Sequence, residues 1–213
     1  MKDFITLVIR HSERIDFIDK NQWKNCARYR INKYDSPISK HGIEIAQDKA
    51  LELQQKYSNL KNAIIISSPF TRCIETSIVL SMMFDDMKIH IEPGLRESFY
   101  GVIDYMDNTM TNENIFNRYR SYINNFNTEY KPIYNYEEMK QTSINPKTEL
   151  TRPIDTIKKI RNMATKNKPI IIITHGLNLV LLVKKMYGNI ETLRMRKKIC
   201  GKDPCSFCAT IEI

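Results

Sequence analysis

The chain has 213 residues, of which 42% are hydrophobic and 27% are charged, and both fractions are typical of a folded globular protein. This length allows one α/β domain with a sizeable core and is short for two domains. No apolar run reaches the roughly 18 residues that a membrane span needs, and the N-terminal stretch lacks the pattern of a secretory signal. We therefore expect a single domain over residues 1–213, cytoplasmic and without a membrane partner.

The chain is basic, with 33 lysines and arginines against 24 aspartates and glutamates, so that its formal net charge is +9. Such an excess favours an anionic partner, for example nucleic acid or a phosphorylated ligand. The basic runs at 158–161, 184–185 and 194–198 fall mostly on predicted helix surfaces, and neither an aromatic RNA-binding strand nor a zinc-finger spacing accompanies them. We expect solvated helix faces at these runs and no nucleic-acid partner.

The cysteines are odd in number, which is unlike the paired framework of a secreted disulfide protein. Cys205 and Cys208 have CxxC spacing, but a zinc site usually needs a second pair and only Cys200 lies near. A redox CxxC would open a helix after a strand, whereas this one leads into a strand-like tail. We expect these cysteines to pack in the core, and we expect no metal and no cofactor.

Three apolar strands are predicted in the first half of the chain, at residues 4–9, 63–66 and 88–91. A long polar connection over 11–38 holds the only tryptophan and leads to a helix over 39–57 that Ser39 caps. Helical spacing predicts that this helix buries Ile43, Ala46, Ala50 and Leu53. The same spacing predicts that the helix after the second strand buries Ile74, Ile78 and Met82.

The second half begins with a segment over 99–147 that is rich in Asn, Tyr and Met. We expect it to be an insertion that covers one end of the sheet, with a helix near 112–126 and a loop near 131–146. A helix over 148–165 follows, which is expected to bury Leu150, Ile154, Ile157 and Ala164. The strongest strand of the chain is predicted at 169–174, followed by a helix over 178–187 and a last strand over 207–213.

Strands that alternate with helices predict an α/β fold, with a mostly parallel central sheet and helices on both of its faces. In such sheets ligands bind beyond the carboxyl ends of the strands. His11 and His175 each follow directly on an unbroken apolar strand, Arg10 precedes the first of them, and Arg72 opens the helix after the second strand. We therefore expect these side chains to converge at one edge of the sheet.

The chemistry of this set is that of phosphoryl transfer. Arginine forks bind phosphate oxygens in a bidentate way and stay charged at any working pH. A neutral histidine can attack phosphorus and carry the phosphoryl group. A carboxylic acid must then protonate the leaving oxygen. Glu97, just past the third strand, is placed for that role, and Glu13 competes with it, whereas His41 and His90 receive no role.

The ordered set RH, DSPISKHG, SSPFTRCIETS, GLRE and THG resembles the histidine phosphatase superfamily, which is also called phosphoglycerate mutase-like. The resemblance extends from Arg10 to Gly176, and it implies that His11 is the phosphorylated nucleophile and Glu97 the proton donor. It also implies a catalytic part for His175. The phosphate clamp that the resemblance implies consists of Arg10, Arg14, Arg72 and His175.

A narrower resemblance is to the phosphatase domain of the UBASH3/Sts proteins, carried by RHSERID, by the long connection with Trp23 and Arg30, and by the tail PCSFC. This resemblance is the reason for including Arg14 in the clamp, and it implies a structural role for the tail. It also makes a homodimer plausible. The segment after Glu97 has no tryptophan, so we expect the rim that faces the substrate to differ.

The sequence thus predicts a metal-independent phosphomonoesterase that works through a phosphohistidine. Its expected partner is a phosphorylated small molecule or a phosphoprotein, with phosphotyrosine or another aryl or alkyl phosphate as the reacting group. Two alternatives share the same residues: phosphoryl transfer of the phosphoglycerate mutase type, and a catalytically weak module that binds phosphorylated ligands. The long connection after His11 favours hydrolysis over mutase chemistry.

Overall fold

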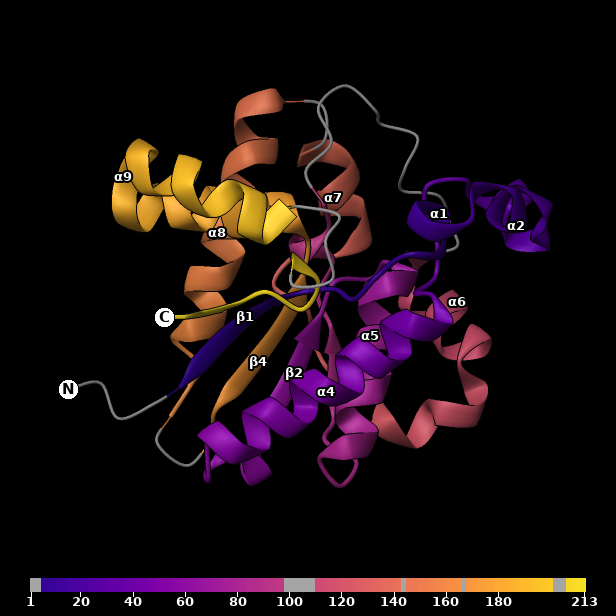
Figure 1. Ribbon diagram of the computed structural model, residues 1–213, viewed down its shortest axis with the longest axis horizontal. Helices are drawn as coiled ribbons and strands as arrows, with labels where there is room; N and C mark the ends of the chain where they lie inside the picture. Colours follow the sequence, from indigo (N-terminus) through magenta and orange to yellow (C-terminus); the bar gives the residue numbers. More distant parts are fainter. Residues whose placement is uncertain (1–4, 98–109, 143–144, 166–167, 201–205) are drawn as a thin grey trace.

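The computed structural model describes residues 5–97, 110–142, 145–165, 168–200 and 206–213 (Figure 1). Its centre is a five-stranded sheet in the order β3-β2-β4-β1-β5, in which β5 runs antiparallel to β1 and the other neighbours are parallel. The strands are β1 Thr6–Arg10, β2 Ile64–Ser67, β3 Ile89–Ile91, β4 Ile170–Thr174 and β5 Thr210–Glu212. This arrangement confirms the predicted α/β fold with a mostly parallel sheet.

Helices cover both faces of the sheet. One face packs against α4 Lys40–Lys56, α5 Thr71–Met83 and α6 Asn112–Arg118, and the 3-10 helix η5 Arg120–Asn125 lies against α5. The other face packs against α8 Pro146–Arg161 and α9 Gly176–Cys200. In Figure 1 α4 and α5 cross in front of the strands, while α1 and α2 project from one side of the molecule.

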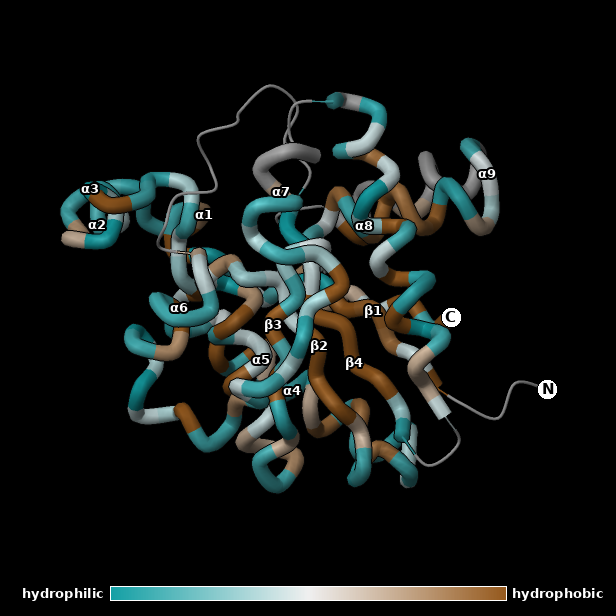
Figure 2. The backbone as a smooth tube through the Cα atoms, turned by 180° about the vertical axis from the view of Figure 1, so that it is seen from behind, coloured by the Kyte–Doolittle hydropathy of each residue, from teal (hydrophilic) through white to brown (hydrophobic). Residues whose placement is uncertain are grey.

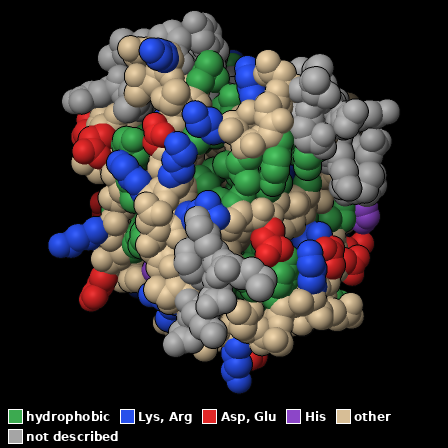
Figure 3. All heavy atoms as spheres, turned by 90° about the vertical axis from the view of Figure 1, so that its left-hand side faces the viewer, with side chains coloured by type: hydrophobic (Ala, Val, Ile, Leu, Met, Phe, Trp, Pro, Cys, Tyr) green, Lys and Arg blue, Asp and Glu red, His purple; other side chains and the backbone are tan. Residues whose placement is uncertain are grey.

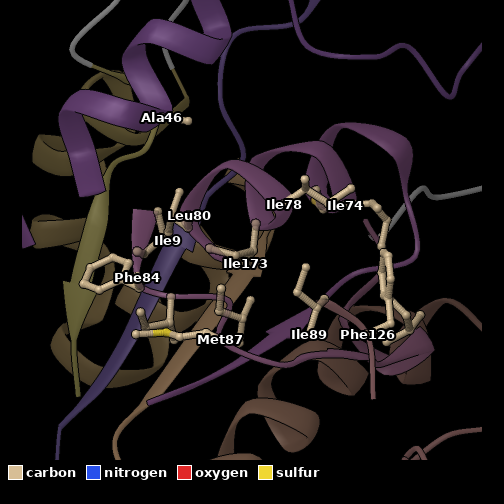
Figure 4. Packing of buried hydrophobic residues seen from close by; sticks show 14 of the residues in the cluster. Ile9, Ala46, Ile74, Ile78, Leu80, Phe84, Met87, Ile89, Phe126 and Ile173 are labelled. Carbon is tan, nitrogen blue, oxygen red and sulfur yellow. The ribbon is translucent and has the colours of Figure 1, made fainter. Parts of the chain in front are cut away.

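Successive side chains of each strand point to opposite faces of the sheet, and this divides the core into two clusters. Leu7 and Ile9 of β1 point to the side of α4 and α5, and Val8 between them points to the side of α8 and α9. The strands are apolar on both faces, which Figure 2 shows as brown tubes at the centre of the molecule. Figure 4 shows the first cluster, in which Ile9, Ile89 and Ile173 of the sheet lie beside residues of the covering helices.

The strand register brings the ends of β1 and β4 together. Arg10 pairs with Thr174, and the backbone N–H of His11 donates to the Thr174 carbonyl over 2.9 Å. The N–H of Ser68, just beyond β2, donates to the Ile173 carbonyl over 3.0 Å. His11, Ser68 and His175 therefore follow their strands at one edge of the sheet, where parallel strands present their carboxyl ends.

The long connection after β1 is not a simple loop. It forms three short helices, α1 Ile15–Ile18, α2 Lys20–Asn25 and α3 Ala27–Ile31. The Asp19 side chain caps α2 by accepting from the N–H groups of Asn21 and Gln22. Each of these helices has fewer than two turns, so the sequence cannot show a repeating spacing of hydrophobic residues along them.

Several predicted details were wrong. Within the predicted loop 131–146 lies α7 Tyr136–Thr142, and the predicted helix near 112–126 is divided into α6 and η5. The helix predicted at 178–187 continues to Cys200 across a kink at Gly188, whose φ is 82°. The remaining 3-10 helices are η1 Leu60–Asn62 and η2 Pro93–Leu95. The start of the predicted insertion, 99–109, lies outside the described residues, as does Cys205.

Three apolar side chains that were predicted to be buried are instead exposed: Ile43 at 41%, Met82 at 57% and Leu150 at 39%. In α4 the buried stripe is Gly42, Ala46, Ala50 and Leu53. Ala46, Ala50 and Leu53 were predicted correctly, and only the first position differs. Gly42 faces inward in place of Ile43 because it approaches the backbone of Glu13, where a Cβ would lie 2.5 Å from the carbonyl oxygen. Hydrophobic spacing alone does not report such a backbone contact.

Candidate active site

His11 is buried at the tip of β1, and its hydrogen bonding fixes the state of the ring. Nδ1 lies 2.7 Å from the carbonyl oxygen of Ser12, which can only accept, so Nδ1 carries the proton. Nε2 of the neutral ring then bears the lone pair. Burial, followed by the positive charges of Arg72, Arg10 and Arg14, holds the pKa of His11 well below its ordinary value. The ring is therefore neutral at neutral pH.

His175 lies beside His11, with ring centroids 5.5 Å apart and the planes at 65°. Its Nδ1 is 3.1 Å from Nη2 of Arg72, and a guanidinium can only donate, so Nδ1 accepts. Nε2 then carries the proton of the neutral ring and donates to Oγ of Ser68 over 2.8 Å. Burial, together with the charge of Arg72, lowers the pKa of His175 well below its ordinary value.

Arg72 is fully buried in the first turn of α5, and its guanidinium contacts residues from three other segments of the chain. Nη2 donates to Oε2 of Glu97 over 2.7 Å, and Nη1 donates to the carbonyl of Tyr34 over 3.3 Å. The same Glu97 oxygen lies 3.6 Å from Nδ1 of His175. Arg72, Glu97 and His175, which were predicted from separate segments, thus form one contiguous group.

The other two predicted arginines have different partners. Arg14 forms a two-pronged ion pair with Asp16, at 2.8 and 2.5 Å. Arg10 donates through Nη1 to the carbonyls of Ile199 and Ser206, at 3.0 and 3.2 Å, so it ties the tip of β1 to the C-terminal part of the chain. Both act on His11 through their charge, because both lower its pKa.

Glu13 has a role in the packing of α4. Its Oε1 accepts from Oγ of Ser39 over 2.5 Å, and His41 Nδ1 lies 3.4 Å from the carboxylate. Ser39 Oγ in turn accepts from the N–H of Gly42 over 2.8 Å and caps α4. Since the Glu13 carboxylate is occupied at the start of α4, the geometry favours Glu97 over Glu13 as the acid beside the histidines.

A buried network, not anticipated from the sequence, supports Glu97. Glu149 of α8 lies between two arginines, 2.7 Å from Nη2 of Arg96 and 3.2 Å from Nη2 of Arg152. Arg152 also donates to the carbonyls of Gly94 and Arg96. These contacts hold the backbone segment that ends in Glu97. No local signal marks the network, because charged residues on a predicted helix usually face solvent.

The described residues contain no group of three or more His, Cys, Asp or Glu side chains that could hold a metal ion. Cys26, Cys73 and Cys208 are free thiols. Burial raises the pKa of Cys208 to about 11, which keeps its sulfur protonated and unreactive at neutral pH. Ser68 and Asp16 are the site neighbours that the sequence did not single out, although Ser68 stands in a polar segment directly after an apolar strand.

The family is established by comparison with known sequences. The profile of the histidine phosphatase superfamily (branch 1) matches residues 7–210, so the chain belongs to this superfamily. An uncharacterized phosphoglycerate mutase family protein, R708 of Acanthamoeba polyphaga mimivirus, is 37% identical over 92 residues. That match covers 42% of this chain and 42% of the viral protein, so it spans less than half the length of that relative.

Solved structures share the fold. The ecdysone phosphate phosphatase of Bombyx mori, in complex with tungstate, has a TM-score of 0.65 at 18% identity, covering 98% of this chain and 88% of its own. A protein of Agrobacterium tumefaciens that is named as a candidate phosphohistidine phosphatase SixA has a TM-score of 0.52 at 10% identity, covering 98% of this chain and 90% of its own. Each helix that the structure describes is either too short or too polar to traverse a lipid bilayer.

Proposed function

We propose that this protein is a metal-independent phosphomonoesterase whose nucleophile is His11. The observation that carries the proposal is the state of that ring, because Nδ1 is held by the Ser12 carbonyl and Nε2 is left with its lone pair. Burial, and then the charges of Arg72, Arg10 and Arg14, keep the pKa of this ring low and the ring neutral, and the same three charges favour an incoming phosphate dianion. A buried neutral imidazole among cations suits nucleophilic attack on phosphorus.

The reaction has two steps. Nε2 of His11 attacks phosphorus in line, the bond from phosphorus to the ester oxygen breaks, and Glu97 donates a proton to the departing alcohol or phenol. Water then attacks the phosphohistidine, Glu97 takes a proton from that water, and the bond from phosphorus to nitrogen breaks to release inorganic phosphate. Glu97 returns to its starting protonation state at the end of the cycle.

The positive groups stabilise the phosphoryl oxygens during transfer. Arg72, already joined to both Glu97 and His175, is the central member of the clamp, with Arg10, Arg14 and His175 around it. Removal of one such preorganised donor costs on the order of 10²–10³ in rate in comparable sites. Phosphoryl transfer depends mainly on this kind of positioning and charge stabilisation.

The substrate class is a phosphomonoester with an aryl or alkyl leaving group, borne by a small molecule or a phosphoprotein. Membership of the superfamily supports phosphomonoester chemistry. The insect neighbour is by its name a phosphatase of ecdysone phosphate, which supports hydrolysis over mutase chemistry.

The test is turnover of p-nitrophenyl phosphate with EDTA present. We expect His11→Ala to abolish turnover while the circular dichroism spectrum is unchanged, and we expect His41→Ala to retain it, since His41 is exposed and outside the site. An acid-labile, base-stable phosphoprotein should accumulate after rapid quenching of the wild type. Undiminished turnover by His11→Ala would overturn the proposal. Interconversion of phosphoglycerates faster than phosphate release would make the protein a mutase.

A further inference from the structure

A cavity of about 290 Å³ lies among the three short helices that follow β1. Figure 2 shows these helices, α1, α2 and α3, grouped at one side of the molecule. The cavity has an aromatic wall of Trp23, Tyr29 and Tyr34. It also has a rim of lysines from α2 and from the segment after α3, namely Lys20, Lys24 and Lys33.

The aromatic wall is held in place by its own contacts. The indole N–H of Trp23 donates to the Lys33 carbonyl over 3.1 Å, and the Trp23 and Tyr29 rings meet edge to face with centroids 5.6 Å apart. Trp23 is buried, with 3% of its surface exposed. The cavity is therefore formed by packed side chains and not only by mobile lysines.

Two contacts connect this cavity with the phosphate clamp. Asp16, which lines the cavity, is the partner of Arg14 in the two-pronged ion pair. Tyr34, which also lines it, accepts from Nη1 of Arg72 through its carbonyl over 3.3 Å. One wall of the cavity is thus in direct contact with two arginines of the proposed clamp, Arg14 and Arg72.

The charge of the cavity is positive. The Asp16 carboxylate is balanced by Arg14, whereas the lysine side chains at the rim are exposed. Low-dielectric aromatic surface beside these ammonium groups strengthens their attraction for an anion, relative to the same groups in open solvent. The cavity therefore suits the acidic end of a ligand whose other end is the reacting phosphate.

We propose that this cavity is the leaving-group subsite and selects phosphomonoesters whose leaving group carries a second anionic group, a carboxylate or a phosphate. The proposal rests on the proposed phosphatase function. The lysines affect which substrate binds, whereas the histidines, Glu97 and the arginines carry out the phosphoryl transfer.

A second lysine-rich cavity provides a matched control. It lies between α8 and α9, with a volume of about 400 Å³, and is lined by Lys158, Lys184 and Lys185 beside apolar side chains. Figure 3 shows the side of the molecule that carries α9, where hydrophobic and basic side chains lie next to one another. None of these three lysines has a described contact with the arginines of the clamp, so the control removes the same charge at a different place.

The kinetic experiment compares phenyl phosphates that carry a carboxylate on spacers of graded length with their methyl esters, which have nearly the same size and no second charge. In the wild type we expect kcat/KM to be higher for the carboxylate at one spacer length. In the triple variant Lys20→Gln, Lys24→Gln, Lys33→Gln the ratio of kcat/KM between carboxylate and ester should fall about tenfold, as expected for a few exposed charge pairs. Its kcat/KM for phenyl phosphate should stay near that of the wild type.

The control variant Lys158→Gln, Lys184→Gln, Lys185→Gln should keep the preference. An equal loss in both triple variants would assign the effect to net charge and overturn the proposal. The absence of any preference in the wild type over the whole series would overturn it as well.

A binding experiment separates failure of this proposal from failure of the proposed function. Trp23 is the only tryptophan of the chain and lines the cavity, so its fluorescence reports occupancy without turnover. The variant His11→Ala is titrated with the same carboxylates and esters. Tighter binding of the carboxylate, with a change in Trp23 emission, supports the subsite even if the wild type shows no phosphatase activity. Equal affinity for carboxylate and ester would contradict it.

Discussion

Arg72 Nη2 lies 2.7 Å from Oε2 of Glu97, and so a central member of the proposed phosphate clamp also holds the proposed proton donor. The same nitrogen lies 3.1 Å from Nδ1 of His175. A guanidinium can make these contacts at once because its five donors lie in a fixed plane. If Arg72 binds a phosphate oxygen as proposed, this contact couples phosphate binding to the position of the proposed proton donor.

Arg72→Lys keeps the positive charge, and yet it should lower activity strongly because the planar guanidinium is lost. A lysine ammonium is a point charge and cannot bridge Glu97, His175 and a phosphate oxygen together. We expect kcat/KM for p-nitrophenyl phosphate to fall roughly 10²–10³-fold. Arg161→Lys, in the last turn of α8, is the control for the same exchange away from the site. A loss of less than about tenfold in Arg72→Lys would argue against the clamp.

Glu97→Gln tests the proton donor. The amide keeps the shape of the side chain but cannot protonate a leaving oxygen. An alkyl phosphate, whose alkoxide is a poor leaving group, should lose about 10²–10⁴-fold in kcat/KM, the usual contribution of general acid catalysis. A p-nitrophenyl phosphate needs little protonation and should lose much less. Steady-state rates on both substrates check this, and equal losses would show that Glu97 has another role.

The buried histidines predict a stability that falls in acid. The pKa values of His11 and His175 lie well below the ordinary value in the folded protein, through burial and then the charge of Arg72, so the unfolded chain binds protons first. The contribution of the two neutral rings to the free energy of unfolding is fully present above about pH 6.5, and it declines as the pH falls toward the pKa values of the folded protein. Each histidine contributes up to about 1.4 kcal/mol per pH unit in that range.

Urea unfolding at pH 7 and pH 5 measures this dependence. The double variant His11→Gln, His175→Gln should lose less free energy of unfolding between the two pH values than the wild type does. The exposed His41 gives the comparison, since His41→Gln removes a histidine that is largely in contact with solvent. An unchanged pH dependence in the double variant would contradict the assignment of both rings as neutral.

Glu149→Gln should destabilise the fold. The carboxylate lies between Arg96 and Arg152, and all three side chains are buried. Removal of one partner from a buried ion pair leaves charge uncompensated and costs about 3–5 kcal/mol. The pair of half-buried Lys49 and exposed Glu52 provides the control, because Glu52→Gln should change the free energy of unfolding by less than about 1 kcal/mol. Equal effects of the two variants in urea unfolding would contradict this expectation.

Gly42→Ala should affect both stability and activity. A Cβ at this position would lie 2.5 Å from the carbonyl oxygen of Glu13, so α4 or the segment after His11 must move. Overpacking of this kind costs about 1–3 kcal/mol. Ala46→Gly in the same helix is a control that creates space and no clash. We expect thermal unfolding to show a loss in both variants, and kcat/KM to fall only in Gly42→Ala.

The predicted fold was accurate where the signal is local. All five predicted strands are present, each within a few residues of its expected bounds. The errors fall where polar residues are buried. In α5 the hydroxyls of Thr76 and Ser77 are buried because they donate to carbonyls one turn earlier, over 2.7 and 2.8 Å. The spacing correctly placed Ile74 and Ile78 of this helix in the core, but it did not show that Thr76 and Ser77 are buried and that Met82 is exposed.

The sheet and the edge at which the candidate site lies could be read from the sequence, because apolar strands that end in Arg10-His11 and Thr174-His175 must present these residues at the carboxyl edge. The partner of each polar side chain became visible only in the folded protein. Glu13 turns to Ser39 of α4, Glu97 turns to Arg72, and Asp16 brings the lysine-rimmed cavity against Arg14. These pairings join segments that are distant in the chain, and hydrogen bonds over such distances depend on packing that no local pattern encodes.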